Sequence, residues 1–231
     1  MVRLTESALS LSGNQLKIIA LIAMTCDHVG MMFFPDAPFL RLIGRIAMPI
    51  FAWMIAEGCR YTRRRSRYLL GIALLALVCQ GVNWIATQSL FQCILVTFSL
   101  SILLIFLLDN AREKPWGLWA FFGALACVLF LTEVLPRLAT QTDFDIDYGF
   151  CGIMLPVLFY IGKDKKQSLL LGALGLAALS LTMGPTQWFC LLSLPLLALY
   201  SGRRGKWRLK YLFYIYYPAH LAVIYLLWFL I

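Results

Sequence analysis

The chain has 231 residues, of which 61% are hydrophobic and only 13% are charged. A soluble domain carries about 25% charged residues, so this composition excludes an ordinary soluble protein. The net charge of +9 would suit a nucleic-acid partner, but the basic residues lie between apolar blocks about as long as a bilayer is thick. We therefore expect no nucleic-acid partner and an all-α bundle of transmembrane helices, with one domain over residues 1–231.

Nine apolar segments follow one another, and each is expected to form a membrane-spanning helix. They cover residues 16–34, 40–59, 68–86, 91–108, 116–135, 149–161, 168–183, 187–200 and 211–231. The sixth and eighth segments are short for a hydrocarbon core of about 30 Å. Either could be a tilted or re-entrant element, so eight spans remain an alternative.

Lysines and arginines are concentrated in every second connection between the apolar segments. Fifteen of the 20 lysines and arginines lie in the second, fourth, sixth and eighth connections, whereas the odd-numbered connections hold only Arg41 and Arg137. Because short cytoplasmic loops concentrate Lys and Arg, this pattern places the N-terminus inside the cell and the C-terminus outside. The same loops could hold the headgroups of anionic membrane lipids.

The first two segments carry ionisable residues at bilayer depth. Asp27 and His28 lie past the middle of the first segment, and Arg45 lies at a similar depth in the second. Such residues are costly in hydrocarbon and mark functional sites. A short connection makes the two helices antiparallel neighbours, so Arg45 is expected to pair with Asp27, and it could also grip an anionic substrate group. Asp27 and His28 diverge by about 100° around a helix, so they cannot face the same way.

Other polar residues allow two explanations each. Glu57 is expected near the inner interface, where an ion pair with a nearby arginine is as good an explanation as a ligand contact. His220 follows a proline that should bend the last helix, and an interhelical hydrogen bond is its simpler role. Asp147 belongs to an acidic stretch that is either a solvated loop or a cap over a cavity. No metal-ligand spacing or phosphate-binding glycine loop is present, so we expect no metal.

Several of these residues fall in motifs that resemble those of the TraX family of integral membrane proteins. The motifs run in family order along almost the whole chain. They are Leu16-Lys17-Ile18-Ile19-Ala20, Asp27-His28-Val29-Gly30, the run LRLIGRIAMPIFA at residues 40–52, Glu57-Gly58, Asp147-Tyr148-Gly149-Phe150, and the run YIYYPAHL at residues 214–221. The Asp-His pair together with the run at residues 40–52 is the most specific part of the resemblance.

The resemblance implies acetyl transfer. The family is known for acetylating the amino terminus of a conjugative pilin subunit, and it is similar to acyltransferases that move acetyl groups from acetyl-CoA across the bacterial inner membrane. On that basis His28 is the general base, Asp27 orients or charges it, and Arg45 stabilises negative charge on the thioester oxygen. The residues expected to contact the substrates are Glu57, His220, Tyr217, Asp147, Arg60 and Arg63, of which the two arginines would attract the phosphates of acetyl-CoA.

The sequence leaves more than one acceptor and more than one activity open. A peptide or pilin amino terminus and a sugar hydroxyl are both compatible with the sequence, because the third segment departs from the family pattern around Gln80 and Asn83. A proton-coupled transporter could use the same intramembrane charges, although only one proline-broken polar site is evident where such transporters have paired ones. A non-catalytic assembly factor for a surface structure is the third function.

Overall fold

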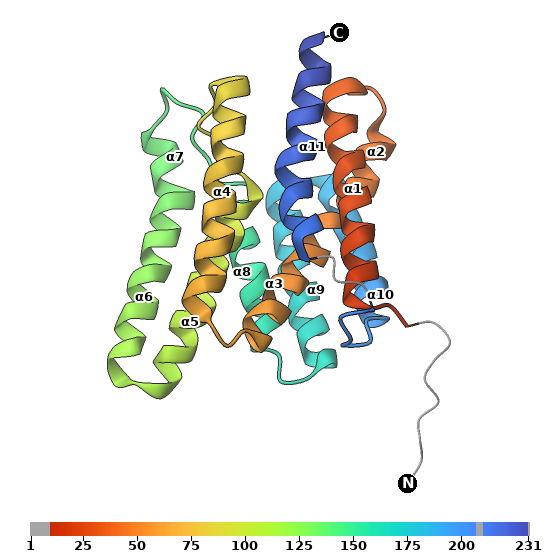
Figure 1. The fold of residues 1–231 in the computed structure, drawn as a ribbon. Helices are drawn as coiled ribbons and strands as arrows, with labels where there is room; N and C mark the ends of the chain where they lie inside the picture. The colour runs from red at the N-terminus through yellow and green to blue at the C-terminus, as the bar shows by residue number, and fades with distance from the viewer. Residues whose placement is uncertain (1–9, 207–209, 231) are drawn as a thin grey trace.

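The computed structural model describes residues 10–206 and 210–230 of the chain. In this part the regular structure is entirely helical, and the extended backbone is limited to two isolated β-bridges, Leu11 with Tyr200 and Gln92 with Ile146. The helices run up and down in alternation as one bundle (Figure 1). The expected all-α class is therefore confirmed.

Six of the nine expected segments form helices long and apolar enough to cross a membrane. They are α1 (Gly13–Phe33), α2 with α3 (Pro38–Gly44 and Ala47–Tyr61), α4 (Arg65–Thr87), α5 (Ile94–Glu113), α6 with η1 and α7 (Pro115–Leu129, Phe130–Val134 and Leu135–Leu138), and α9 (Lys165–Met183). The other three segments correspond to α8 (Gly149–Ile161), η2 with α10 (Pro185–Leu192 and Ser193–Ala198), and α11 (Lys210–Leu230). All nine segments are thus helical, and six of them meet the criteria of a span among the described residues.

The expected span over residues 40–59 corresponds to one membrane-length segment, Pro38–Tyr61, in which two turn residues, Arg45 and Ile46, separate α2 from α3. Arg45 closes α2 and donates from its backbone N–H to the carbonyl of Arg41. The same carbonyl oxygen also accepts a hydrogen bond from Nε of Arg45, at 3.2 Å. The interruption of a helix next to buried charged residues therefore lies between α2 and α3. The last helix, where a proline-induced break was expected, continues through Pro218.

A 3₁₀-helix explains how the short eighth segment fits the bundle. A 3₁₀-helix rises about 2.0 Å per residue, against about 1.5 Å for an α-helix. The eight residues of η2 and the six of α10 therefore cover about 25 Å, which is close to the thickness of a hydrocarbon core. The short length of this segment in sequence does not make it short in space.

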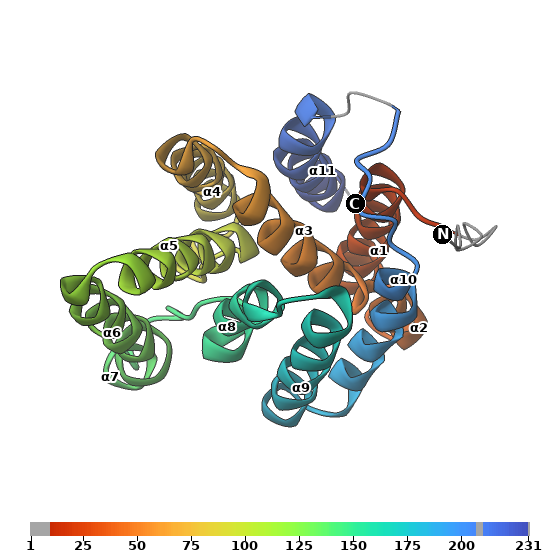
Figure 2. The ribbon, with the colours of Figure 1, turned by 90° about the horizontal axis from the view of Figure 1, so that it is seen from below.

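Helix α3 lies at the centre of the bundle, with α1, α4, α5, α8 and α10 arranged around it (Figure 2). Together with α2 it has 56% of its apolar window buried, whereas the span that begins with α6 has 11% and lies at the edge. Small residues on α3 allow this close packing. Ala47, Ala52 and Ala56 are all buried against neighbouring helices.

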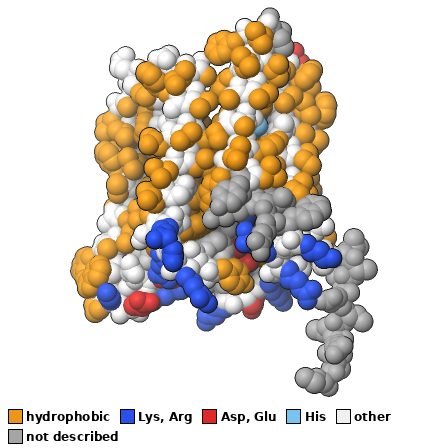
Figure 3. Space-filling view, in the orientation of Figure 1, with side chains coloured by type: hydrophobic (Ala, Val, Ile, Leu, Met, Phe, Trp, Pro, Cys, Tyr) orange, Lys and Arg blue, Asp and Glu red, His pale blue; other side chains and the backbone are white. Residues whose placement is uncertain are grey.

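Lysines and arginines gather at one end of the bundle, the lower end in Figure 3. The α3–α4, α5–α6, α8–α9 and α10–α11 connections all lie at that end (Figure 1). These are the four connections that the sequence marks as basic, so the alternation of charge matches the alternation of the helices. We refer to this end as the basic end.

Candidate active site

Asp27 and Arg45 form an ion pair between α1 and the α2–α3 turn. Oδ1 of Asp27 lies 2.6 Å from Nη2 of Arg45, and Oδ2 lies 3.3 Å from Nη1 of Arg41. The Arg45 side chain is 11% exposed and that of Asp27 is 18% exposed. Arg45 also donates to Oε1 of Gln187 in η2, at 3.1 Å. The pairing expected between the first two segments is therefore confirmed, and it reaches a third element, η2.

His28 faces a different neighbour, α11. Its Nδ1 lies 2.9 Å from the carbonyl oxygen of Met24 and 3.4 Å from Nε2 of His220. The two imidazole rings meet edge to face with their centroids 5.1 Å apart. One turn earlier on α1, the hydroxyl of Thr25 lies 2.7 Å from that of Tyr216. Both histidines of the chain therefore belong to one polar contact between α1 and α11.

Asp27 and His28 accordingly have separate partners, as their divergence around the helix predicts. The hydrogen bonds found for the Asp27 carboxylate in the described residues go to Arg41 and Arg45. Those found for the His28 ring go to Met24 and His220. The role of Asp27 in orienting His28 stays a prediction, and no hydrogen bond among the described residues supports it.

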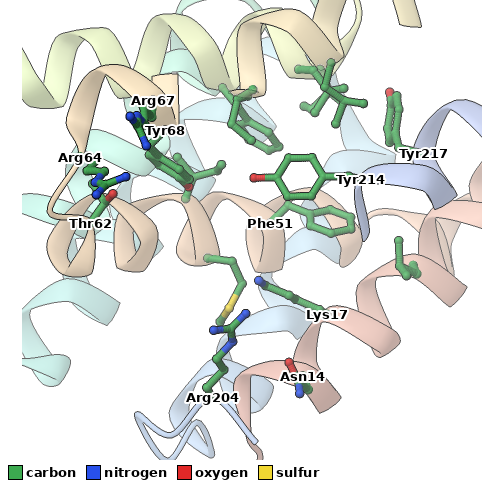
Figure 4. Close-up of a pocket in the computed structure, with 18 residues that line it drawn as sticks. Asn14, Lys17, Phe51, Thr62, Arg64, Arg67, Tyr68, Arg204, Tyr214 and Tyr217 are labelled. Carbon is green, nitrogen blue, oxygen red and sulfur yellow. The ribbon is translucent and has the colours of Figure 1, made fainter. Parts of the chain in front are cut away.

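A cavity of about 600 Å³ opens between α1, α3, α4, α5 and α11 (Figure 4). Its basic-end lining contains Lys17, Arg64, Arg67 and Arg204, and its interior is mostly apolar. The remaining lining residues are Asn14, Leu21, Phe51, Met54, Ile55, Thr62, Tyr68, Ile72, Leu75, Ile94, Leu95, Phe98, Tyr214 and Tyr217. The cavity therefore combines an apolar interior with cations at one end, which suits a ligand with an anionic head and an apolar arm.

Tyr217 connects the cavity to the histidines. It lines the cavity, it is buried, and its ring lies edge to face with that of His220, with centroids 5.3 Å apart. His220 is in turn in contact with His28. Of the nine residues that the sequence singled out, Tyr217 is the one in the cavity wall, and His220 and His28 lie directly behind it.

Glu57 and Arg60 lie in a separate network away from the cavity. They are paired at 2.8 Å, and Tyr200 donates to the other carboxylate oxygen of Glu57 at 3.2 Å. Arg60 also donates to the carbonyl of Phe159 near the end of α8 and to the hydroxyl of Ser168. A cation is stabilising at a helix C-terminus, so these contacts hold α3, α8 and α9 together. The ion-pair explanation of Glu57 is therefore confirmed.

Arg63 and Arg64 are both exposed, but only Arg64 lines the cavity. Arg64 and Arg67 are the arginines of this stretch that line the cavity, and the contact of Arg60 and Arg63 with acetyl-CoA stays a prediction. Sequence reasoning also missed Lys17, Tyr68 and Tyr214. Lys17 carried a usable signal, since a lysine inside an apolar segment is costly unless it faces a polar site.

Asp147 lies in the connection that leads into α8. The backbone N–H of Asp147 donates to the carbonyl of Gln92 at 3.0 Å, and the N–H of Gln92 donates to the carbonyl of Asp145 at 2.7 Å. The Thr97 hydroxyl donates to the carbonyl of Asp147 at 2.7 Å. Burial raises the pKa of the Asp147 carboxyl to about 7, although the nearby Arg45 guanidinium opposes the rise. The next residue, Tyr148, has a φ of +62°, which is uncommon for a non-glycine residue. This half-buried connection is therefore more than a solvated loop, and it lies close enough to Arg45 and Asp27 to feel their charges.

A multi-pass helical bundle with buried charges and a basic-ended cavity defines a class of polytopic membrane protein with an intramembrane polar site. The family model described as TraX protein matches residues 12–228, and the chain therefore belongs to the TraX family.

The chain is also similar to two curated proteins. The chain is 23% identical to the "Probable fimbrial assembly protein FimC, serogroup H1" of Dichelobacter nodosus, over 92% of this chain and 94% of the relative. It is 28% identical to "Uncharacterized protein RP591" of Rickettsia prowazekii (strain Madrid E), over 67% of this chain and 57% of that protein. No solved structure matches the chain significantly.

Proposed function

We propose that this protein is a membrane-embedded acetyltransferase that moves an acetyl group from acetyl-CoA to an acceptor on the opposite side of the bilayer. The observation that carries the proposal is the cavity, which has cations at its basic end and ends against Tyr217, next to His220 and His28. The acceptor is a peptide amino terminus, such as that of a pilin, or a sugar hydroxyl. TraX family membership supports the same conclusion.

The donor enters from the basic end. Acetyl-CoA is polyanionic at its nucleotide end, and Arg64, Arg67 and Arg204 provide the positive charge that attracts phosphates. Its thioester-bearing arm then follows the apolar interior toward the histidines. Lys17 and His28 are eleven residues apart on α1, which corresponds to about 16 Å along the helix axis.

His28 supplies the general base. It accepts a proton from the amine or hydroxyl of the acceptor as that group attacks the thioester carbonyl. The acceptor forms a bond to the carbonyl carbon, the C–S bond breaks, and the departing thiolate takes up the proton through the same histidine. Asp27 holds Arg45 in place outside the cavity lining, so in this proposal Arg45 acts on the oxygen that develops negative charge through its positive charge at a distance, and not by direct contact.

The basic end faces the cytoplasm on this proposal, because short cytoplasmic loops concentrate Lys and Arg. The membrane is then the bacterial inner membrane, with the N-terminus in the cytoplasm and the C-terminus outside. Acetyl-CoA is available on the cytoplasmic side, which is the side from which the cavity takes its donor. The basic loops also contact anionic lipid headgroups.

A non-catalytic assembly role is the second candidate, since one relative is named a probable fimbrial assembly protein. In that case the histidine contact would serve only to join α1 and α11. The two functions differ in one requirement, because assembly without chemistry tolerates an apolar residue at position 28.

Ligand-induced stabilisation tests the donor site. We expect acetyl-CoA to raise the melting temperature of the purified protein, and a saturating ligand at about 100 times its Kd stabilises by about 2.7 kcal/mol. Arg204→Gln should weaken this effect, while Lys163→Gln, an exposed basic-end residue outside the cavity lining, is the matched control. No stabilisation by acetyl-CoA, combined with proton-linked uptake of a solute by liposomes, would instead support transport.

A further inference from the structure

The two histidines of the chain face each other across the α1–α11 contact. His28 Nδ1 and His220 Nε2 are 3.4 Å apart, and each ring also has its Nδ1 near a backbone carbonyl. For His28 this is the oxygen of Met24 at 2.9 Å, and for His220 it is the oxygen of Tyr216 at 3.0 Å. The distance of 3.4 Å between His28 Nδ1 and His220 Nε2 is long for a hydrogen bond. Hydrogen bonds between catalytic groups are often this long before a substrate binds.

The carbonyl contacts determine which ring nitrogens carry protons. A carbonyl oxygen can only accept, so Nδ1 of His28 and Nδ1 of His220 must both be the donors. In a neutral imidazole the other nitrogen is then an acceptor. The single N–H of His28 is therefore shared between the Met24 carbonyl oxygen at 2.9 Å and the lone pair of His220 Nε2 at 3.4 Å, and Nε2 of His28 is left as the basic nitrogen. Within residues 10–206 and 210–230, no hydrogen-bond partner is found for that last atom.

The orientation of His220 is held from several sides. The Tyr216 ring stacks on it with centroids 5.4 Å apart, and the Tyr217 ring meets it edge to face at 5.3 Å. Tyr216 is itself tied to α1 by the contact between its hydroxyl and that of Thr25. His220 is 8% exposed. A ring fixed in this way keeps its Nε2 aimed at His28.

Asp27 does not compete for this role. Its carboxylate oxygens are engaged by Arg41 and Arg45 at 3.3 and 2.6 Å, on a different face of α1 from His28. Asp27, which is next to His28 in the sequence, therefore pairs with the arginines, whereas His220, 192 positions away, contacts His28.

We propose that His220 is the positioning residue of His28 and shares the proton that His28 takes up, an inference that rests on the proposed function. When the acceptor gives its proton to Nε2 of His28, the Nδ1 proton of His28 moves toward Nε2 of His220, and the positive charge spreads over both rings. When the thioester C–S bond breaks, the Nδ1 proton returns to His28 and the Nε2 proton passes to the sulfur. No proton is gained or lost by the pair over the reaction.

Nitrogen NMR of the ¹⁵N-histidine-labelled protein in nanodiscs tests the pairing directly. The chain has only two histidines, so the spectrum contains two rings, and His220→Phe leaves His28 alone. We expect both wild-type rings to be protonated on Nδ1, and we expect His220→Phe to move the Nδ1 signal of His28. Cys127→Ala, on an exposed site of α6, is the control that should leave it in place. A His28 ring protonated on Nε2, or a His28 signal that His220→Phe does not move, overturns the pairing.

Acetyl transfer gives the second readout. His220→Phe should slow transfer by about 100-fold, within the range of general acid–base contributions, at an unchanged melting temperature. His220→Gln keeps an acceptor for the His28 N–H and should recover part of the rate. Equal rates in His220→Phe and the wild type would overturn the positioning role. The NMR result does not require activity, so an inactive wild type with the expected spectrum would contradict the proposed function and leave the pairing standing.

Discussion

Gly44 of α2 lies directly against Asp27 of α1: a Cβ placed on Gly44 would be 2.3 Å from the Cβ of Asp27 and 2.4 Å from its Oδ1. The next residue, Arg45, is the one that pairs with that carboxylate at 2.6 Å. The ion pair therefore depends on the absence of a side chain at position 44, because only this absence allows α1 and α2 to come so close.

Gly44→Ala should consequently destabilise the protein. The added methyl group meets Asp27 close to its backbone, where little movement is available, and overpacking of this kind costs about 1–3 kcal/mol. The measurement is thermal unfolding of the purified protein in detergent. Gly71→Ala on α4 is the control, since a Cβ there meets nothing within 4 Å and alanine is the better helix former. The account is contradicted if both variants melt at the same temperature.

The Asp27–Arg45 pair should show coupling in a double-mutant cycle. Asp27→Asn alone leaves the Arg45 charge without its counter-ion at bilayer depth, which costs about 3–5 kcal/mol, whereas Arg45→Gln leaves Asp27 with Arg41 at 3.3 Å and should cost less. The double variant removes both charges and should lose clearly less than the sum of the single variants. Unfolding of the four proteins under one set of conditions gives the coupling. Strictly additive losses would show that the two side chains do not depend on each other.

The sequence predicts much of this architecture and less of the site. Hydropathy located all nine helical segments, and the depths of Asp27 and Arg45 predicted their pairing. Hydropathy does not report which way a membrane helix faces, because both the lipid side and the buried side are apolar. For this reason the arginines of the second connection could not be told apart: Arg60 caps α8, Arg63 is exposed, and Arg64 lines the cavity.

Local sequence patterns also could not predict the cavity, the histidine contact or the turn between α2 and α3. The cavity is lined by residues from five helices and two connections, and no local pattern in the sequence records that they meet. The contact between His28 and His220 joins opposite ends of the chain. The turn after Gly44 lies where α2 packs against Asp27, and a local helical pattern in the sequence runs through it.

Arg63 and Arg64 should differ in their effect on the donor. Arg64→Gln removes a cation from the cavity lining and should weaken acetyl-CoA binding about tenfold, which corresponds to about 1.4 kcal/mol. Arg63→Gln removes the same charge from an exposed position one residue away and should change the affinity much less. Titration calorimetry of the two variants decides this. Equal losses would mean that the basic end acts through its overall charge rather than through the cavity.

Asp147 should make stability depend on pH. Its pKa of about 7 in the folded protein is above the value of about 3.9 for an unfolded aspartate. The folded protein therefore holds a proton that the unfolded chain releases between about pH 4 and 7, so stability falls as the pH rises through that range. Asp147→Asn removes this contribution, and its melting temperature relative to the wild type should be higher at pH 8 than at pH 5. A constant difference between the two proteins across this range would contradict the raised pKa.

The most direct test of acetyl transfer is mass spectrometry of surface peptides and glycans from cells that produce either the wild-type protein or His28→Ala in equal amounts in the membrane. We predict that one or more extracytoplasmic molecules carry an acetyl group in the first case and lack it in the second. If the two sets of acetylated molecules are identical, His28 is not the base of an acetyltransferase and the account is wrong.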